Sequence, residues 1–120
     1  MPPEPASPPD VPLIAAVLLR IGPLEIRPAE LQVFVDGRRT GLTVREFEVL
    51  NVLAHHADRV LTREAIYTAV WTGSMPRRDR CVDVFVRKVR LKLARAAPDW
   101  TFIHTHFGIG YRLEPERRGG

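Results

Sequence analysis

The chain has 120 residues, of which 45% are apolar and 27% are charged, and this composition is typical of one globular domain. Its single cysteine excludes an intramolecular disulfide and a cysteine metal cluster, which fits a reducing cytoplasm. The net charge of +4 is modest, but eight Lys and Arg against two Asp give residues 76–95 a balance of +6. Such a concentration of positive charge is typical of a protein that binds a polyanion.

Both ends of the chain are expected to be flexible. Six of the eleven prolines lie in residues 1–12, so we expect residues 1–16 to form an extended, proline-rich tail. Residues 115–120 include three charged residues and end in two glycines, and we expect a second loose tail there. The apolar run from Leu13 to Leu19 is too short to span a membrane. We therefore predict a domain over residues 17–114 in a soluble, cytoplasmic protein.

The first half of this domain is expected to form a small sheet and a helix. Branched residues in 17–26 and 31–35, followed by Asp36-Gly37, predict an antiparallel sheet with a tight hairpin. Thr43 and Glu46 have the spacing of a capping box, which predicts a helix that begins there and ends near residue 55.

The second half is expected to contain two more helices and a hairpin. Thr62 can cap a helix over 63–71, and the polar loop 72–78 leads to a third helix over 79–94. Strands at 101–105 and 111–113, joined by the turn 108–110, then close the domain. The predicted fold class is α+β, with a helix-turn-helix followed by a hairpin, which is a winged helix.

The third helix carries the functional prediction. At 100° per residue, four apolar residues fall in one stripe that faces the core, namely Val82, Val86, Val89 and Leu93. The opposite face is basic and holds Arg80, Val84, Arg87, Lys88 and Leu91, with Cys81 at its edge and Asp83 and Arg90 on its flank. A major groove about 12 Å wide admits such a helix, and Arg and Lys can donate to guanine O6 and N7.

Several blocks of the chain carry a family resemblance in a fixed order. They are Leu42-Thr43 with Glu46-Phe47 and Leu50, Arg59 to Glu64, Val70-Trp71, Asp79 to Val84, Arg87 to Arg90, Leu93, Thr105 and Gly108 to Arg112. Over about residues 24–113 the chain resembles the OmpR/PhoB-type effector domain of bacterial two-component response regulators. The resemblance implies an N-terminal antiparallel sheet, a three-helix core and a C-terminal hairpin wing, in a protein that regulates transcription by binding promoter DNA.

The resemblance also implies roles for single residues. Base reading falls on Lys88, with Cys81, Val84 and Arg87 beside it. Phosphate binding falls on Trp71, Arg80, Arg87, Arg90, Thr105 and Tyr111. The wing 101–113, with His104, His106 and Phe107, is expected on the adjacent minor groove or backbone. The loop of Thr72, Gly73, Ser74, Met75, Pro76, Arg77 and Arg78 matches a family segment that can touch RNA polymerase. We expect a monomer in solution that pairs on direct-repeat DNA.

The chain departs from the family pattern at several positions. Members often carry Thr where this chain has Cys81, His where it has Phe85, and a wing Arg where it has Phe107. Members usually place a receiver domain before this one, whereas here a proline-rich stretch precedes it. We therefore expect either an orphan regulator or a piece of a longer protein.

Other functions are weighed against DNA reading. The outward apolar residues Val84 and Leu91 also fit a winged helix that docks an acidic protein partner without specific DNA binding. His104 and His106 alternate on a strand but lack further ligands, so we expect no metal and no other cofactor. No nucleophile stands beside a base at a recognisable spacing, so we expect no enzyme. The cations around Cys81 predict a lowered thiol pKa and leave redox sensing as an alternative.

Overall fold

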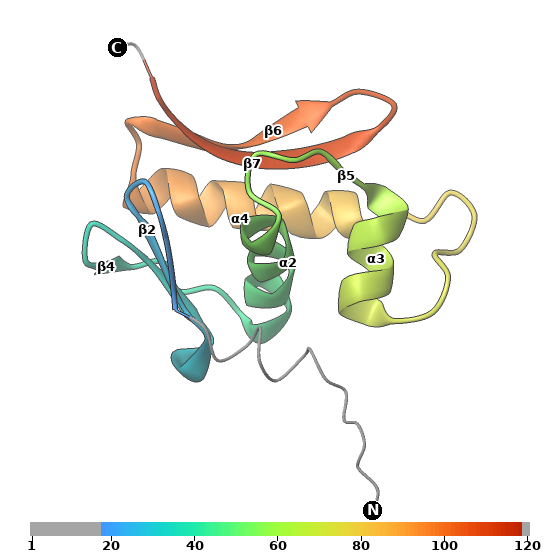
Figure 1. Cartoon of the computed structure of the whole chain (residues 1–120), viewed down its shortest axis with the longest axis horizontal. Coiled ribbons are helices and arrows are strands. Elements are labelled where there is room, and N and C mark those ends of the chain that lie inside the picture. Colours follow the sequence, from blue (N-terminus) through green and yellow to red (C-terminus); the bar gives the residue numbers. More distant parts are fainter. Residues whose placement is uncertain (1–17, 119–120) are drawn as a thin grey trace, which may run out of the picture.

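The computed structural model describes residues 18–118, so the predicted tail 1–16 lies outside the described residues. The first sheet is antiparallel with strand order β1-β2-β3-β4. Its strands are β1 (Leu19–Ile21), β2 (Leu24–Arg27), β3 (Gln32–Val35) and β4 (Arg38–Arg39), and the short 3-10 helix η1 (Pro28–Glu30) joins β2 to β3. The N-terminal antiparallel sheet predicted from the sequence is confirmed (Figure 1).

The predicted apolar stretch 17–26 is two strands, because Gly22 adopts φ +58 and Pro23 follows it, which turns the chain back on itself. The Asp36-Gly37 hairpin is confirmed. Both residues have positive φ, 48° and 82°, which matches the twist of the flanking strands. The hairpin also forms β4, which the sequence did not predict.

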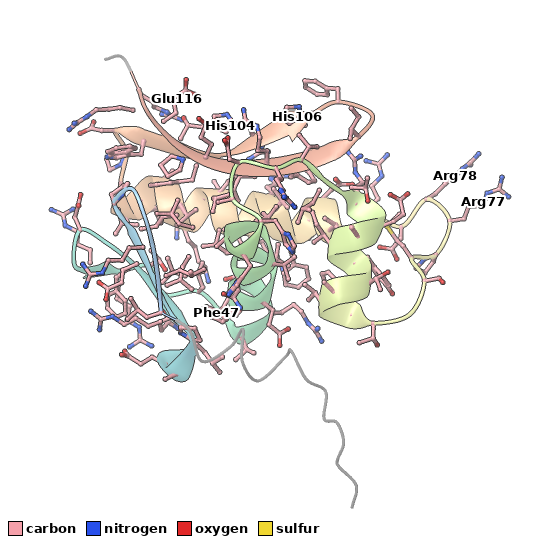
Figure 2. The ribbon with its side chains drawn as sticks, in the orientation of Figure 1. Phe47, Arg77, Arg78, His104, His106 and Glu116 are labelled. Carbon is pink, nitrogen blue, oxygen red and sulfur yellow. The ribbon has the colours of Figure 1, made fainter. Side chains whose placement is uncertain are left out.

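The described residues contain three α-helices, as predicted: α2 (Val44–His55), α3 (Arg63–Trp71) and α4 (Cys81–Ala96). The capping box at α2 is confirmed, with Glu46 N donating to Thr43 Oγ1 at 3.3 Å and Thr43 N donating to Glu46 Oε1 at 2.9 Å. Thr62 caps α3 by accepting from Ala65 N at 3.0 Å. Phe47, labelled in Figure 2, is 2% exposed, so α2 is buried deep in the core.

A second antiparallel sheet closes the domain. Its order is β5-β7-β6, formed by β5 (Leu61–Thr62), β6 (Trp100–His106) and β7 (Gly110–Arg117). Residues 115–117, expected to be part of a loose tail, continue β7 instead, because Glu116 pairs with Thr101 and Arg117 with Trp100. At Gly110 the strands β7 and β5 approach so closely that a Cβ would lie 1.8 Å from the Leu61 carbonyl oxygen.

The elements pack around α4. The β6–β7 hairpin lies along one side of α4, α2 crosses α4 on another, and α3 packs near the N-terminal end of α4 (Figure 1). The first sheet lies toward the other end of α4, where α2 contacts β3. Within residues 18–118, no helix has the length and apolar character needed to cross a membrane. This arrangement buries one face of α4 and leaves the opposite face open.

Candidate nucleic-acid interface

The two faces of α4 are as the helical periodicity predicts. Val82, Val86, Val89 and Leu93 are each at most 2% exposed and pack into the core. The opposite face is exposed and carries Val84, Arg87, Lys88, Leu91, Ala94 and Arg95. Val84 and Leu91 are about half exposed, at 46% and 53%. A rigid helix therefore presents cations and apolar groups together to solvent.

The helix α4 begins two residues later than predicted. The helix begins at Cys81 rather than at residue 79, with Arg80 as its N-cap, and the Asp79 carboxylate accepts from Cys81 N at 2.6 Å just before the first turn. Its end at Ala96 lies beyond the predicted residue 94. Arg80, just before the helix, is exposed.

The predicted effect of the cations on Cys81 is wrong. A hydrogen bond to Asp79, together with burial, raises the pKa of the Cys81 thiol above its ordinary value. The charge that acts on the thiol is that of Asp79, which disfavours the thiolate. A raised pKa means less thiolate at neutral pH, so it gives no support to redox sensing by Cys81.

Asp83 joins α4 to both α3 and the hairpin. Arg63 Nε donates to Asp83 Oδ1 at 2.8 Å, and the Tyr111 hydroxyl donates to the same carboxylate. Burial acts to raise the pKa of Asp83, but the hydrogen bonds from Tyr111 and Arg63 outweigh it and lower the pKa. Tyr111 itself is 5% exposed, and burial and the bond to Asp83 raise its pKa. The Tyr111 hydroxyl therefore donates its hydrogen bond to a partner inside the domain.

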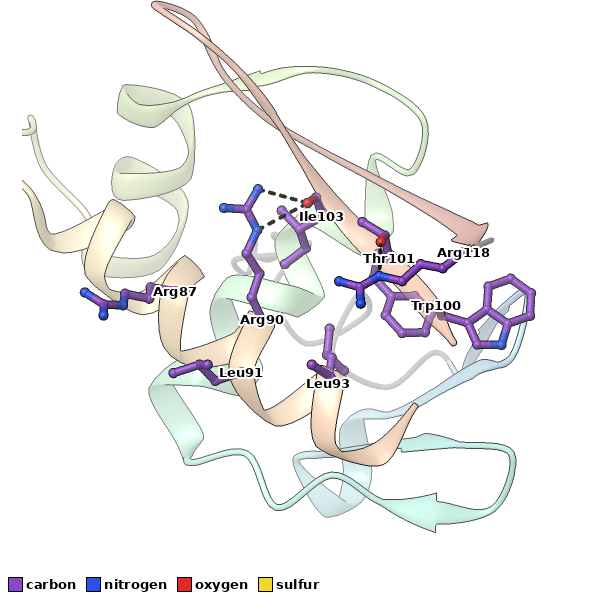
Figure 3. A pocket seen from close by; sticks show the side chains of 10 residues that line it. Arg87, Arg90, Leu91, Leu93, Trp100, Thr101, Ile103 and Arg118 are labelled. Atoms are coloured by element: carbon purple, nitrogen blue, oxygen red, sulfur yellow. Dashed lines mark hydrogen bonds between the residues drawn. The ribbon is translucent and has the colours of Figure 1, made fainter. Parts of the chain in front are cut away.

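Arg90 makes the second connection between α4 and the hairpin. Its Nε and Nη2 donate to the Ile103 carbonyl oxygen at 3.2 and 2.9 Å, as the dashed lines in Figure 3 show. Nη2 also donates to Thr105 Oγ1 at 2.6 Å. Burial lowers the pKa of Arg90. Three predicted phosphate ligands, Arg90, Thr105 and Tyr111, thus lie together and make hydrogen bonds within the domain that fix the wing.

Trp71, another predicted phosphate ligand, is half-buried at the end of α3. Its ring stacks on Tyr67 with centroids 5.3 Å apart and meets Phe85 edge-on at 5.4 Å. The Arg45 guanidinium lies over the Trp71 ring at 5.1 Å. The ring therefore packs α3 against α4, beside the exposed face of α4.

The wing carries its predicted residues on and near its tip. His104 and His106 lie on β6, labelled in Figure 2. His104 Nε2 is 2.9 Å from the Glu114 carbonyl oxygen, and His106 Nε2 accepts from Arg112 Nε at 3.1 Å. Phe107 follows at the turn and is 90% exposed. Within residues 18–118, no three His, Cys, Asp or Glu side chains come together as metal ligands.

The loop between α3 and α4 projects from the body of the domain. Figure 2 shows Arg77 and Arg78 pointing outward from it. Two of its bends use positive φ, 62° at Thr72 and 59° at Arg78, and Thr68 Oγ1 donates to the Gly73 carbonyl oxygen at 2.9 Å. Except for half-buried Met75, the residues of the segment 72–78 are exposed.

Sequence reasoning missed a second basic surface beside α4. Arg38 and Arg39 of β4 line a hollow with Lys92 and Arg95 of α4. Lys92 is partly neutralised, because its Nζ lies 2.7 Å from Glu46 Oε1. The many basic residues in 76–95 indicated that Arg95 belongs to a positive surface. No pattern in the sequence indicated that the β3–β4 hairpin lies beside α4. The surface extends the positive charge toward the C-terminal end of the helix.

An exposed basic helix that follows a shorter helix and precedes a hairpin defines a winged helix-turn-helix domain. Residues 37–113 match the family model described as "Transcriptional regulatory protein, C terminal". The chain belongs to this family, a class of transcription regulators rather than of enzymes, and the predicted resemblance to OmpR/PhoB-type effector domains is confirmed.

Relatives and solved structures agree with this assignment. The chain is 36% identical over 94 residues to the alkaline phosphatase synthesis transcriptional regulatory protein PhoP of Bacillus subtilis, and 33% identical over 96 residues to the transcriptional regulatory protein CreB of Escherichia coli. These matches cover 78% and 80% of this chain but only 39% and 42% of the relatives. The Klebsiella pneumoniae RstA DNA-binding domain in complex with the RstA box superposes with a TM-score of 0.73 at 30% identity, covering 81% of this chain and 96% of that one.

Proposed function

We propose that this domain binds double-stranded promoter DNA in a sequence-specific manner and so regulates transcription. The observation that carries the proposal is the exposed face of α4, where Arg87 and Lys88 stand on a helix anchored through its opposite face. The RstA domain, which shares this fold, was solved in complex with its own DNA box, and this supports the same partner here. Acting on promoters would place the chain at the nucleoid in a bacterial cytoplasm.

Base reading is assigned to the centre of the exposed face. Lys88 lies over the Phe85 ring, with Nζ 4.8 Å from its centroid, which limits the conformations of a long side chain. Val84, one turn earlier, offers an apolar contact to a thymine methyl group. Arg87 can donate to guanine or to a phosphate. Half-buried Cys81 lies at the edge of the same face of α4.

Phosphate binding is assigned to the edges of the same face. Arg80 and Arg87 are exposed cations about two turns apart along α4, and the indole N–H of Trp71 can donate to a phosphate. Arg90, Thr105 and Tyr111 serve the interface by fixing the wing, since their polar atoms bond Ile103, each other and Asp83. The exposed loop 72–78, with Arg77 and Arg78, is our candidate for contact with RNA polymerase.

A mobility shift with promoter DNA and a large excess of non-specific competitor tests the proposal. We expect a competitor-resistant complex that is weakened by Lys88→Ala. Arg20→Ala is the matched control, because Arg20 is an exposed cation on β1, away from α4, and its loss should leave binding unchanged. Binding that disappears entirely under competitor would contradict specific recognition.

A winged helix that docks an acidic protein is the second candidate. The observation in its favour is the exposure of Val84 and Leu91 between the cations of α4. This candidate predicts that the chain captures an acidic polypeptide but shows no preference among DNA sequences. The same competition experiment, with a polyglutamate competitor added, separates the two candidates.

We propose further that a single chain is a monomer that pairs only on DNA. One such domain buries a small interface, roughly 600–1,000 Å² by analogy with other lone modules, so one half-site should be bound weakly. Two half-sites in direct repeat, about one helical turn apart, should be filled cooperatively. Light scattering of the free chain and titrations on one against two half-sites check both parts. A stable dimer without DNA would contradict the proposal.

A further inference from the structure

The wing tip presents an apolar side chain in a fixed position. Phe107 is 90% exposed, the largest value among the exposed large apolar side chains of the described residues, and Ile109 on the same turn is 53% exposed. The turn is well defined, since His106 pairs with Gly110 and Ile109 N donates to the His106 carbonyl oxygen at 2.9 Å. The phenyl ring therefore stands out from an ordered hairpin.

The base of the same hairpin lies beside an exposed cation. Tyr111 of the hairpin donates to Asp83 of α4, and the exposed Arg80 is close enough to Asp83 to help lower the pKa of that carboxylate. Tyr111 pairs with Thr105, which lies two residues, or about 7 Å along the strand, before Phe107.

A partner that fits both the cation at the base of the hairpin and the apolar tip must offer anions on its rim and an apolar interior within reach. Double-stranded DNA has this form, because phosphates border its grooves and stacked bases lie between them. The turn 107–109 has the sequence Phe-Gly-Ile and carries no cation, so it has no charge to place on the floor of a groove.

We propose that Phe107 is a wedge that enters the minor groove beside the helix and partly separates two stacked base pairs. Apolar wedges of this kind kink a duplex by about 20–90° toward the major groove. Such a kink would bend the DNA around α4, which occupies the neighbouring major groove. The proposal rests on the DNA binding proposed above and adds a preference for easily unstacked TA and CA/TG steps at a position where no base is read by a hydrogen bond.

The test uses the whole chain and the duplex that wild type selects from a random-sequence library. A 2-aminopurine at the flanking step reports unstacking, and energy transfer between dyes at the duplex ends reports bending. We expect Phe107→Ala to abolish both signals and to weaken binding about tenfold, the order expected for the loss of one base–aromatic contact. Phe107→Leu keeps an apolar wedge and should retain most of both signals. Val44→Ala, which removes an exposed apolar group at the start of α2, is the matched control and should behave as wild type.

The outcomes separate this inference from the proposed function. If Phe107→Ala unstacks and bends the duplex as wild type does, the wedge is overturned while DNA binding stands. If wild type itself prefers no sequence over competitor, both proposals fall. If Phe107→Ala leaves the bend unchanged but abolishes self-association of the chain on light scattering, Phe107 belongs to a protein contact and the wedge is overturned. Because each substituted side chain is exposed, circular dichroism should show an unchanged fold for every variant.

Discussion

Arg87 and Arg90 lie about one turn apart on α4 but differ in burial and in hydrogen bonding. Arg90 is half-buried and donates to the Ile103 carbonyl oxygen and to Thr105, so its charge holds the wing. Arg87 is exposed and makes no hydrogen bond or ion pair with another described residue. The same contrast separates Lys92, which is tied to Glu46, from Lys88. The basic stretch therefore divides into internal cations that build the domain and external cations available to a polyanion.

The largest effect on folding is expected at Asp83, which the internal cations surround. Asp83→Ala should lower the free energy of unfolding by about 2–3 kcal/mol, because it leaves the Arg63 guanidinium and the buried Tyr111 hydroxyl without their acceptor. Arg87→Ala, on the external side, should change stability by less than about 0.5 kcal/mol. Urea unfolding of both variants checks the division, and equal losses would break it.

The next largest effect is expected at Lys88 and concerns binding. Lys88→Ala should weaken binding to the best site by about 2 kcal/mol and relax the preference at one base pair. Arg87→Ala should weaken all sequences to a similar degree, since its main partner is a phosphate. Titrations on a set of single-base variants of the site distinguish the two results. An unchanged preference in Lys88→Ala would mean that the helix lies in the groove with another face.

Salt should affect binding through the external cations alone. For about four to six phosphate contacts, doubling the salt concentration should weaken binding about tenfold or more. Arg87→Ala should reduce the slope of log K against log salt by about 1, whereas Lys92→Ala should not, because Lys92 is paired with Glu46. Fluorescence anisotropy over a salt series measures the slope, and a flat response would exclude a phosphate-dominated interface.

Acid should weaken the internal network in a narrow range of pH. Burial acts to raise the pKa of Glu46, but hydrogen bonds from Lys92 and Thr43 lower it below 4.5, and the pKa of Asp83 is likewise held below 3.8. Since folding lowers both pKa values, their stabilising effect is complete above about pH 5 and is lost as the pH falls through the folded-state values. Acid unfolding followed by circular dichroism should therefore be less steep in Asp83→Asn. An identical acid profile would show that Asp83 contributes no such linkage.

Local patterns allowed much of this structure to be predicted. The capping box at Thr43, the Asp36-Gly37 hairpin and the two faces of α4 depend on neighbours within a turn, and each is confirmed. The strand β5 and the extension of β7 were missed, because two residues of Leu61–Thr62 carry no periodic signal until β7 pairs with them.

The interior of the candidate site could not be predicted in the same way. Asp83 meets partners 20 and 28 residues away, and no spacing rule connects a carboxylate on a helix to Arg63 and Tyr111. Arg90 and Thr105 were grouped by family role, but their bond to each other follows from burial at the point where α4 meets the hairpin. The sequence and the helical angle predict which way the cations of α4 face. They do not predict which of these cations are already paired with another group of the domain.

The close approach at Gly110 marks the point in the hairpin at which a side chain is not tolerated. A side chain there would push β5 away, and with it Thr62, whose hydroxyl caps α3. At Gly108, two residues earlier, a Cβ would meet no heavy atom within 4 Å. Residues 107–109 therefore form an exposed tip on a hairpin whose base is fixed. We expect that other turn sequences can replace them between His106 and Gly110 without disturbing β5 or the cap of α3.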